Sequence, residues 1–195
     1  TLKSFGGAGE NTAYTATTSY FNPKLCKIIY SSCCPKNGTI FDPFSSVVRP
    51  YMAKILDYNY VGCEVRKDEC DKINEMLNTN SLFEESDVRV LNMDCREFET
   101  DQKFDLVFIC PPYWNLETYS EQDNDLSSIA DYSDFLTEMS KVYSKCSSLM
   151  HDESYCCFVV ADFRDYSEGR KLINRLVPFV SDMIRCGEES GLSLY

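Results

Sequence analysis

The residues best placed to do chemistry follow an apolar run near the middle of the chain. Leu106–Ile109 predicts a buried strand, and the sequence Cys110-Pro111-Pro112-Tyr113-Trp114 follows it directly. Neither proline has an N–H to donate to a strand ladder, so the chain must leave the sheet at this point. Open α/β sheets bind their ligands at that edge. A rigid turn with two carbonyls and two aromatic rings suits a flat ring with a polar edge, such as a nucleobase.

A purely structural role for this turn is the alternative. Tyr113 and Trp114 could cover the core behind a proline turn, and short motifs often mislead. The choice between the two interpretations depends on what precedes the turn in the sequence.

Three carboxylates precede the turn. Asp42, Glu64 and Asp94 each end a short apolar segment. In a nucleoside-binding Rossmann half, the second acid binds the ribose hydroxyls, and the third is placed for the exocyclic amine of adenine. Each carboxylate alone could be a solvated loop group, but three in succession favour a nucleoside site. The G-x-G-x-x-G cradle of a dinucleotide site is absent, so S-adenosylmethionine fits better than a dinucleotide.

The alternation of short strands with amphipathic helices predicts an α/β fold with a doubly wound, mostly parallel sheet, in a single domain over 1–195. Asn22 is a suitable N-cap for the first helix, and Pro23 is a suitable first residue. Further helices are predicted over 48–57, 67–78, 132–150 and 168–186. Strands are predicted over 39–44, 58–65, 88–91, 104–109 and 155–160. Residues 1–22 predict a loop. Residues 191–195 predict the start of a sixth strand, from which we expect either truncation or disorder after Tyr195.

Composition is typical of a globular enzyme. The chain has 195 residues, of which 44% are hydrophobic and 13% aromatic, which excludes a disordered chain. No run approaches the ~18 apolar residues of a membrane span, and no signal-peptide pattern is visible. The net charge of −12 is unusual for a protein that binds nucleic acid alone, because neutralised phosphates supply much of the affinity. If the chain acts on nucleic acid, we expect a basic partner subunit, a further segment or one-sided clustering of Lys and Arg to supply positive charge.

The eleven cysteines predict reduced, buried thiols rather than disulfides. They lie in apolar strand and helix patterns, such as Cys33-Cys34 and Cys156-Cys157, and none has the C-x-x-C spacing of a zinc site. Such thiols indicate a reducing compartment, the cytoplasm or the nucleus. The single histidine, His151, argues against a histidine-based metal site or a Ser-His-Asp triad, and no metal site is predicted.

Several segments, taken in order, resemble the amino-methyltransferases of DNA, and within that family the DNA methylases of phages and mobile elements. The fourth motif of the family is (Asp/Asn/Ser)-Pro-Pro-(Tyr/Phe/Trp), which Cys110-Pro111-Pro112-Tyr113 resembles. The resemblance covers nearly the whole chain. It also runs through Thr18–Pro23, Phe41–Phe44, Tyr60–Glu64, Trp114–Ser120, Asp125–Ser127, Val159–Asp165 and Gly191–Tyr195.

The resemblance implies a Rossmann-like fold and transfer of a methyl group from S-adenosylmethionine to N6 of adenine or N4 of cytosine in DNA. The target base would be extruded and stacked on Tyr113, and its amine would donate to the Pro111 carbonyl and the Cys110 side chain. By this resemblance, the catalytic residues are Cys110, Pro111, Pro112 and Tyr113, and the base contacts are Trp114, Glu117 and Tyr119. The cofactor contacts are Thr18, Ser19, Phe21, Asp42, Pro43, Phe44, Ser45, Glu64 and Asp94.

The chain departs from the family pattern in two places. The segment Ser45–Pro50 contains no glycine where the family has a glycine-rich turn, which lets the backbone approach a ligand closely. Cys110 replaces a stronger acceptor, which shifts the expected target slightly toward cytosine N4. Two other interpretations remain open: a catalytically inert methyltransferase-like subunit that acts as a scaffold or regulatory partner, and the same chemistry on RNA. No target-recognition domain is evident, so the loops over 114–130 or a partner would select the target.

Overall fold

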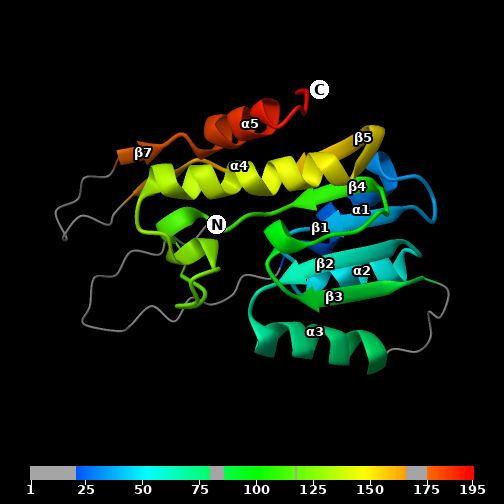
Figure 1. The fold of residues 1–195 in the computed structure, drawn as a ribbon. Helices are drawn as coiled ribbons and strands as arrows, with labels where there is room; N and C mark the ends of the chain where they lie inside the picture. The colour runs from blue at the N-terminus through cyan, green and yellow to red at the C-terminus, as the bar shows by residue number, and fades with distance from the viewer. Residues whose placement is uncertain (1–20, 80–85, 117, 166–174) are drawn as a thin grey trace, which may run out of the picture.

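A five-stranded parallel sheet forms the centre of the molecule (Figure 1). The computed structural model describes residues 21–79, 86–116, 118–165 and 175–195. The strand order is β3-β2-β1-β4-β5, with β1 (Thr39–Asp42), β2 (Asn59–Glu64), β3 (Val88–Asn92), β4 (Phe104–Ile109) and β5 (Met150–Phe158). The helices are α1 (Pro23–Cys33), α2 (Val48–Ile55), α3 (Lys67–Thr79), α4 (Tyr132–Leu149) and α5 (Phe179–Glu189). The predicted doubly wound α/β architecture is confirmed.

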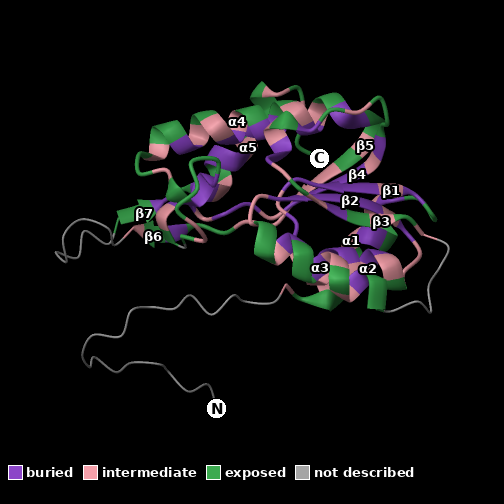
Figure 2. Cartoon of the chain, turned by 60° about the horizontal axis from the view of Figure 1, so that its bottom comes forward, coloured by how far each residue is buried: buried purple, intermediate pink, exposed green. Residues whose placement is uncertain are grey.

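Alternate residues of the strands face two separate apolar layers. Ile40, Leu106 and Phe108 belong to the layer that contains the buried faces of α1, α2 and α3. Their neighbours Phe41 and Val107 belong to the layer that contains α4 and α5. This period of two is the property of a strand whose two faces are both covered, and it explains why the strands read as continuous apolar runs. Figure 2 shows the buried strands between the two helical layers.

The ends of two helices follow directly from their capping residues. The Asn22 side chain accepts a hydrogen bond from the backbone N–H of Lys24, and Pro23 is the first residue of α1, as predicted. Asp131 caps α4 in the same way, accepting from the N–H groups of Ser133 and Asp134.

The C-terminal part of the chain corrects the sequence analysis. The predicted bounds of the last helix, 168–186, are wrong. Residues 175–177 form β7 (Arg175–Val177) instead, which pairs antiparallel with β6 (Phe163–Asp165). Helix α5 begins only after Pro178, since a proline inside a helix removes a hydrogen bond and clashes with the preceding turn. Residues 166–174 lie outside the described residues. Strand β5 also begins earlier than predicted, at Met150, because the polar sequence after Met150 does not look like a strand. Its pairing with β4 has a register shift near this start.

The sixth strand predicted over 191–195 is not present. Instead, Gly191 has a φ of 89° and ends α5. Its N–H donates to the carbonyl of Glu188, and the N–H of Leu192 donates to the carbonyl of Gly187. These two bonds form a Schellman motif, which requires the left-handed conformation that glycine adopts without strain.

The order of the strands places the candidate residues. The order reverses between β1 and β4, which are neighbours in the sheet although α2, β2, α3 and β3 separate them in sequence. The crevice at the carboxyl ends of such strands is the usual ligand site of an open α/β sheet. The segment after β1 and the proline turn after β4 therefore meet there. No helix in the described parts of the chain has both the length and the hydropathy needed to cross a membrane.

Candidate functional site

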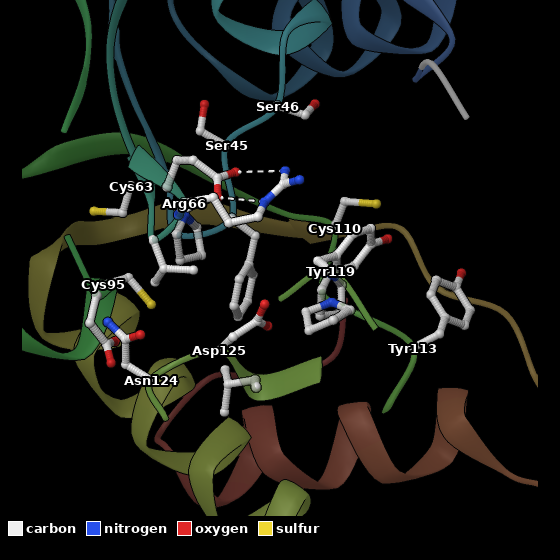
Figure 3. Close-up of a pocket in the computed structure, with 18 of the residues that line it drawn as sticks. Ser45, Ser46, Cys63, Arg66, Cys95, Cys110, Tyr113, Tyr119, Asn124 and Asp125 are labelled. Carbon is white, nitrogen blue, oxygen red and sulfur yellow. Dashed lines mark hydrogen bonds and ion pairs between the residues drawn. The ribbon is translucent and has the colours of Figure 1, made fainter. Parts of the chain in front are cut away.

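A cavity of about 390 Å³ lies at the carboxyl ends of β1, β2 and β4, within the range of ~300–1,000 Å³ of small-molecule sites (Figure 3). Residues 1–20 and Glu117 lie outside the described residues, so the structure does not place Thr18, Ser19 or Glu117. The predicted residues that line the cavity are Phe21, Pro43, Phe44, Ser45, Glu64, Asp94, Cys110, Pro111, Pro112, Tyr113 and Tyr119.

Asp42 is placed beneath the cavity rather than in its wall. It is fully buried, and its carboxylate accepts hydrogen bonds from the Tyr60 hydroxyl at 2.5 Å and the Phe44 N–H at 3.0 Å. Oδ2 of Asp42 lies 2.6 Å from Nε of Arg49. Burial raises the pKa of Asp42, and the charge of Arg49 opposes that rise. With three partners inside the protein, this carboxylate supports the turn after β1.

Arg49 fills the region behind the turn where the sequence lacks glycine. Its guanidinium donates to the carbonyl of Phe44 and lies 5.6 Å and 5.5 Å from the ring centroids of Phe21 and Phe108. Burial alone would lower the pKa of Arg49, but the Asp42 carboxylate together with Cys110, Tyr60 and Tyr30 raises it above its ordinary value. A buried ion pair therefore fixes the turn from inside.

Gly62 allows this turn to rest on the neighbouring strand. The N–H of Ser45 donates to the carbonyl of Cys63 at 2.8 Å. A Cβ on Gly62 would lie 2.6 Å from Oγ and 2.7 Å from Cβ of Ser45, closer than real side chains approach. The single glycine of β2 thus lets the turn after β1 pack directly on this strand.

Glu64 ends β2 with its carboxylate in the cavity wall and engaged by Arg66. Oε1 accepts from the N–H of Arg66 at 2.8 Å and from its Nε at 3.1 Å, and Oε2 accepts from Nη2 at 3.4 Å. Burial raises the pKa of Glu64, although Arg66 counteracts part of that effect. The guanidinium carbon of Arg66 lies 5.5 Å from the ring centroid of Tyr119, which also lines the cavity.

Asp94 follows β3 and is also paired with an arginine. It caps a short 3-10 turn by accepting from the N–H of Arg96, whose Nε lies 3.0 Å from both carboxylate oxygens. Arg96 also binds Glu138 of α4 and donates to the carbonyl of Asn124 at 3.3 Å. Arg96 therefore connects the end of β3 to the loop that closes this side of the cavity.

The proline turn forms the opposite end of the cavity. Pro111 and Pro112 are buried, Cys110 is half-buried, and the half-buried Tyr113 lies in Figure 3 at the end remote from Cys95 and Asn124. The Tyr113 ring packs against Phe163 of β6 and Phe179 of α5, with centroids 5.9 Å and 5.1 Å away. The strand pair β6–β7, which the sequence analysis missed, and helix α5, whose start it misplaced, thus position the tyrosine of the turn.

Trp114, predicted to contact the base, points away from the cavity and anchors the turn. Its side chain is buried, Nε1 donates to the carbonyl of Ile129 at 2.9 Å, and its ring packs on Tyr132. Its φ of 47° lies in the left-handed region, which a bulky residue adopts only when its surroundings hold it there. The strained backbone of Trp114 is required for the chain to leave β4 in this direction.

The loop over 118–128 is held by the buried carboxylate of Asp125. Asp125 accepts from the Ser120 hydroxyl at 2.7 Å and from both the N–H and the hydroxyl of Ser127, at 2.9 Å and 2.7 Å. The Ser127 hydroxyl in turn accepts from the N–H of Tyr119. The sequence analysis assigned target choice to the loops over 114–130 or to a partner. Asn124, Asp125 and Leu126 of these loops line the cavity, and Figure 3 shows Asn124 beside Cys95.

Several solved structures share the fold of this chain. The cyclopropane synthase MmaA2 from Mycobacterium tuberculosis aligns with a TM-score of 0.62 at 9% identity, over 88% of this chain and 60% of that one. An O-methyltransferase of Brevibacillus brevis, in complex with S-adenosyl-L-homocysteine, aligns with a TM-score of 0.52 at 11% identity, over 86% and 49%. A TehB-like SAM-dependent methyltransferase from Corynebacterium glutamicum aligns with a TM-score of 0.51 at 13% identity, over 90% and 75%.

The chain has the Rossmann-like fold of S-adenosylmethionine-dependent methyltransferases. It spans less than two thirds of the length of the first two of these structures. No protein-family model and no curated protein matches the sequence. At these identities, the likeness establishes the fold.

The methyltransferase fold here has a cavity wall built partly of thiols. Burial raises the pKa of Cys95 to about 12 and that of Cys63 higher still, so both thiols stay protonated at neutral pH and act as apolar wall. Within the described ranges, no cluster of His, Cys, Asp or Glu side chains could hold a metal ion.

Sequence reasoning missed many of the lining residues of this methyltransferase fold. These are Ser46, Arg49, Cys63, Val65, Arg66, Cys95, Leu116, Asn124, Asp125 and Leu126. Asp125 had a usable signal, because an Asp two residues before a Ser is a frequent N-cap and turn pattern. Arg66 had none, since an arginine after a strand end is usually a solvated side chain.

Proposed function

We propose that the chain transfers a methyl group from S-adenosylmethionine to the exocyclic amine of adenine or cytosine in DNA. The observation that carries this proposal is the single cavity lined by Ser45, Glu64 and the turn Cys110–Tyr113. Glu64, a carboxylate suited to a ribose, and a turn suited to a nucleobase line the same cavity. Methyl transfer requires the two bound ligands to lie side by side in this way.

The cofactor would lie along the wall from Asp94 and Glu64 to Ser45. Glu64 offers a carboxylate to ribose hydroxyls, Asp94 and Asn124 offer oxygens to an adenine amine, and the thiol of Cys95 offers an apolar surface. When bound, the cofactor supplies an electrophilic methyl group on a sulfonium. Arg66 and Arg96 pair with these two carboxylates, so the wall offers oxygen acceptors to hydroxyls and an amine rather than a net negative charge.

The target base would lie at the Tyr113 end. The ring of Tyr113 offers a stacking face, and the carbonyl of Pro111 with the thiol of Cys110 can accept the two N–H bonds of an exocyclic amine. Hydrogen bonding of both N–H groups directs the nitrogen lone pair out of the base plane. The amine needs no strong base beforehand, because it loses its proton to water after methylation, and positioning supplies most of the rate.

DNA as the substrate rests on the family resemblance, and the charge of the chain limits how it can bind. At a net charge of −12, the chain would gain little from phosphate contacts. We therefore propose that a basic partner subunit or a further segment brings the nucleic acid to the cavity.

An inert methyltransferase-like subunit is the second candidate. Two observations favour it: Arg66 already engages the carboxylate of Glu64, and Arg49 fills the region behind a turn without glycine. In that case, the chain would act as a scaffold or regulatory partner of an active methyltransferase.

A two-step experiment separates these candidates. Calorimetry with S-adenosylhomocysteine tests cofactor binding: we expect micromolar affinity, and no binding at millimolar ligand would support the inert subunit. Transfer of a labelled methyl group to DNA or RNA, followed by mass spectrometry of the nucleosides, then identifies the substrate. Methylated RNA with unmethylated DNA would overturn the DNA assignment.

Tyr113→Ala tests the stacking role. It should lower methyl transfer roughly ten- to hundred-fold, because stacking of a base on an aromatic ring contributes about 1–3 kcal/mol. Tyr155→Ala, at an exposed tyrosine of β5 that does not line the cavity, is the matched control and should leave the rate unchanged. Full activity in Tyr113→Ala would remove the stacking role.

A further inference from the structure

Arg66 is the side chain that connects the two halves of the cavity. It follows β2 and belongs to the wall beside Glu64, yet its guanidinium carbon lies 5.5 Å from the ring centroid of Tyr119, which comes after the proline turn. Figure 3 shows Arg66 and Tyr119 between Cys95 at one end of the cavity and Tyr113 at the other. The Arg66 side chain is 23% exposed, so it is partly shielded from water.

The bonds from Arg66 to Glu64 occupy much of that carboxylate. Oε1 receives two hydrogen bonds, from the N–H and Nε of Arg66, and Oε2 receives a longer one from Nη2. An ionised carboxylate has about four acceptor positions. Two ribose hydroxyls that donate to Glu64 would therefore compete with the guanidinium for the remaining space and lone pairs.

The contact with Tyr119 extends this competition to the substrate side. The N–H of Tyr119 donates to the hydroxyl of Ser127, which is held by the buried Asp125. Tyr119 therefore belongs to a loop with its own internal bonds, and the guanidinium above its ring adds a cation–π attraction between that loop and the end of β2. A displacement of Arg66 changes what holds the loop in place.

We propose that Arg66 is a latch: it links Glu64 to Tyr119 while the cofactor is absent, and ribose hydroxyls at Glu64 release it. This inference rests on the proposed cofactor site. Release of Arg66 frees the Tyr119 side of the cavity for the target base, so the cofactor and the base favour each other's binding. Coupling of this kind is reciprocal, and its usual size is 5- to 150-fold in affinity.

The opposite expectation holds for an arginine that merely supports the site. If Arg66 only completed the wall or bound the cofactor directly, its removal would weaken cofactor binding. If Arg66 competes for Glu64, its removal strengthens cofactor binding. The sign of one affinity change therefore decides between the two roles.

The test compares the whole chain with its Arg66→Gln variant in two measurements. We expect Arg66→Gln to bind S-adenosylhomocysteine roughly five-fold or more tightly by calorimetry. We also expect faster amide hydrogen exchange over 118–128 in the unliganded variant, because the contact to Tyr119 is gone. In the wild-type chain, adding S-adenosylhomocysteine should raise exchange at Tyr119 and its neighbours, but not at 124–126, where the adenine would bind.

Three further variants define the result. Arg89→Gln removes the same charge from an exposed arginine that pairs with Asp87 and does not line the cavity, and it should change neither measurement. Arg66→Lys keeps the charge without the planar fork and should give an intermediate affinity. Tyr119→Leu should raise exchange as Arg66→Gln does, with a smaller effect on affinity because Arg66 still holds Glu64.

Each outcome distinguishes the latch from the proposed function. Weaker or unchanged binding in Arg66→Gln overturns the latch while the cofactor site stands. Binding by Arg66→Gln but not by the wild-type chain supports the latch in its strongest form. If neither protein binds at millimolar ligand, the cofactor site itself is wrong, and the latch falls with it.

Discussion

Glu64 carries a charge that its surroundings do not favour. Burial raises the pKa of this carboxyl, the charge of Arg66 lowers it, and the nearby Glu69 raises it again. A carboxylate that must accept two ribose hydroxyls works best when ionised. The residue therefore connects the pH of the solution to cofactor affinity.

Cofactor affinity should accordingly fall as pH drops, and at a higher pH than an exposed glutamate would give. Because its pKa is raised in the folded chain, Glu64 protonates at a higher pH than an exposed glutamate, and protonation removes its negative charge and turns one acceptor position into a donor. Calorimetry with S-adenosylhomocysteine between about pH 4.5 and 8 checks this, because the window lies above the pKa of ~4.3 of an exposed glutamate. Arg66→Gln should move the decline to higher pH, because removing the cation raises the pKa of Glu64 further. A flat profile would contradict a role for the ionised carboxylate.

Asp42 shows why residue type at a strand end does not fix a role. From the sequence, it is equivalent to Glu64, because both end strands at the same edge. In the fold, Arg49 at the start of α2 draws Asp42 inward, and Tyr60 donates to it from β2. Both partners are separated from Asp42 along the chain, and no local sequence pattern predicts that they meet it in the fold.

At the scale of elements, the sequence predicts strand β4 and the helices with strong caps well. Periodicity and capping act over a few residues, so Asn22 and the apolar run of β4 were sufficient signals. The pairing of β6 with β7 joins residues on either side of 166–174 in the sequence, and no local pattern predicts it. Gly191 and Pro178 did mark the ends of α5, since glycine often ends a helix and proline often begins one. The helix predicted from apolar periodicity alone did not use these two residues.

The fit between the turn after β1 and strand β2 is the element-scale feature that the account depends on most. Gly62→Ala should destabilise the chain by about 1–3 kcal/mol, the usual cost of overpacking, because the new Cβ would collide with Ser45. That corresponds to a fall in Tm of roughly 2–4 °C for each kcal/mol, with weakened binding of S-adenosylhomocysteine.

Gly187→Ala is the control for this substitution. Its added Cβ would meet no atom closer than 3.8 Å, and alanine is preferred to glycine in a helix such as α5. Thermal unfolding should show an unchanged or higher Tm. An equal loss of stability in both variants would show that Gly62 has no special role in docking the turn.

At the scale of the whole molecule, charge sets the conditions under which nucleic acid can bind. With 31 acidic and 19 basic residues, the chain repels a phosphate backbone at long range. We expect the isolated chain to bind duplex DNA more weakly than the ~10⁻⁴ M limit usual for non-specific binding, with little dependence on salt. Fluorescence anisotropy with labelled DNA over a salt series measures both. Tight, steeply salt-dependent binding would show that the chain needs no basic partner.

The central claim is that one cavity at the carboxyl edge of the sheet holds an adenosyl group beside the proline turn. A crystal structure of the chain grown with S-adenosylhomocysteine tests it most directly. The account predicts the ribose hydroxyls on Glu64, the adenine between Asp94 and Leu126, and the sulfur facing Cys110 and Pro111. A ligand seated elsewhere, or a cavity that stays closed around Arg66 at saturating ligand, would contradict it.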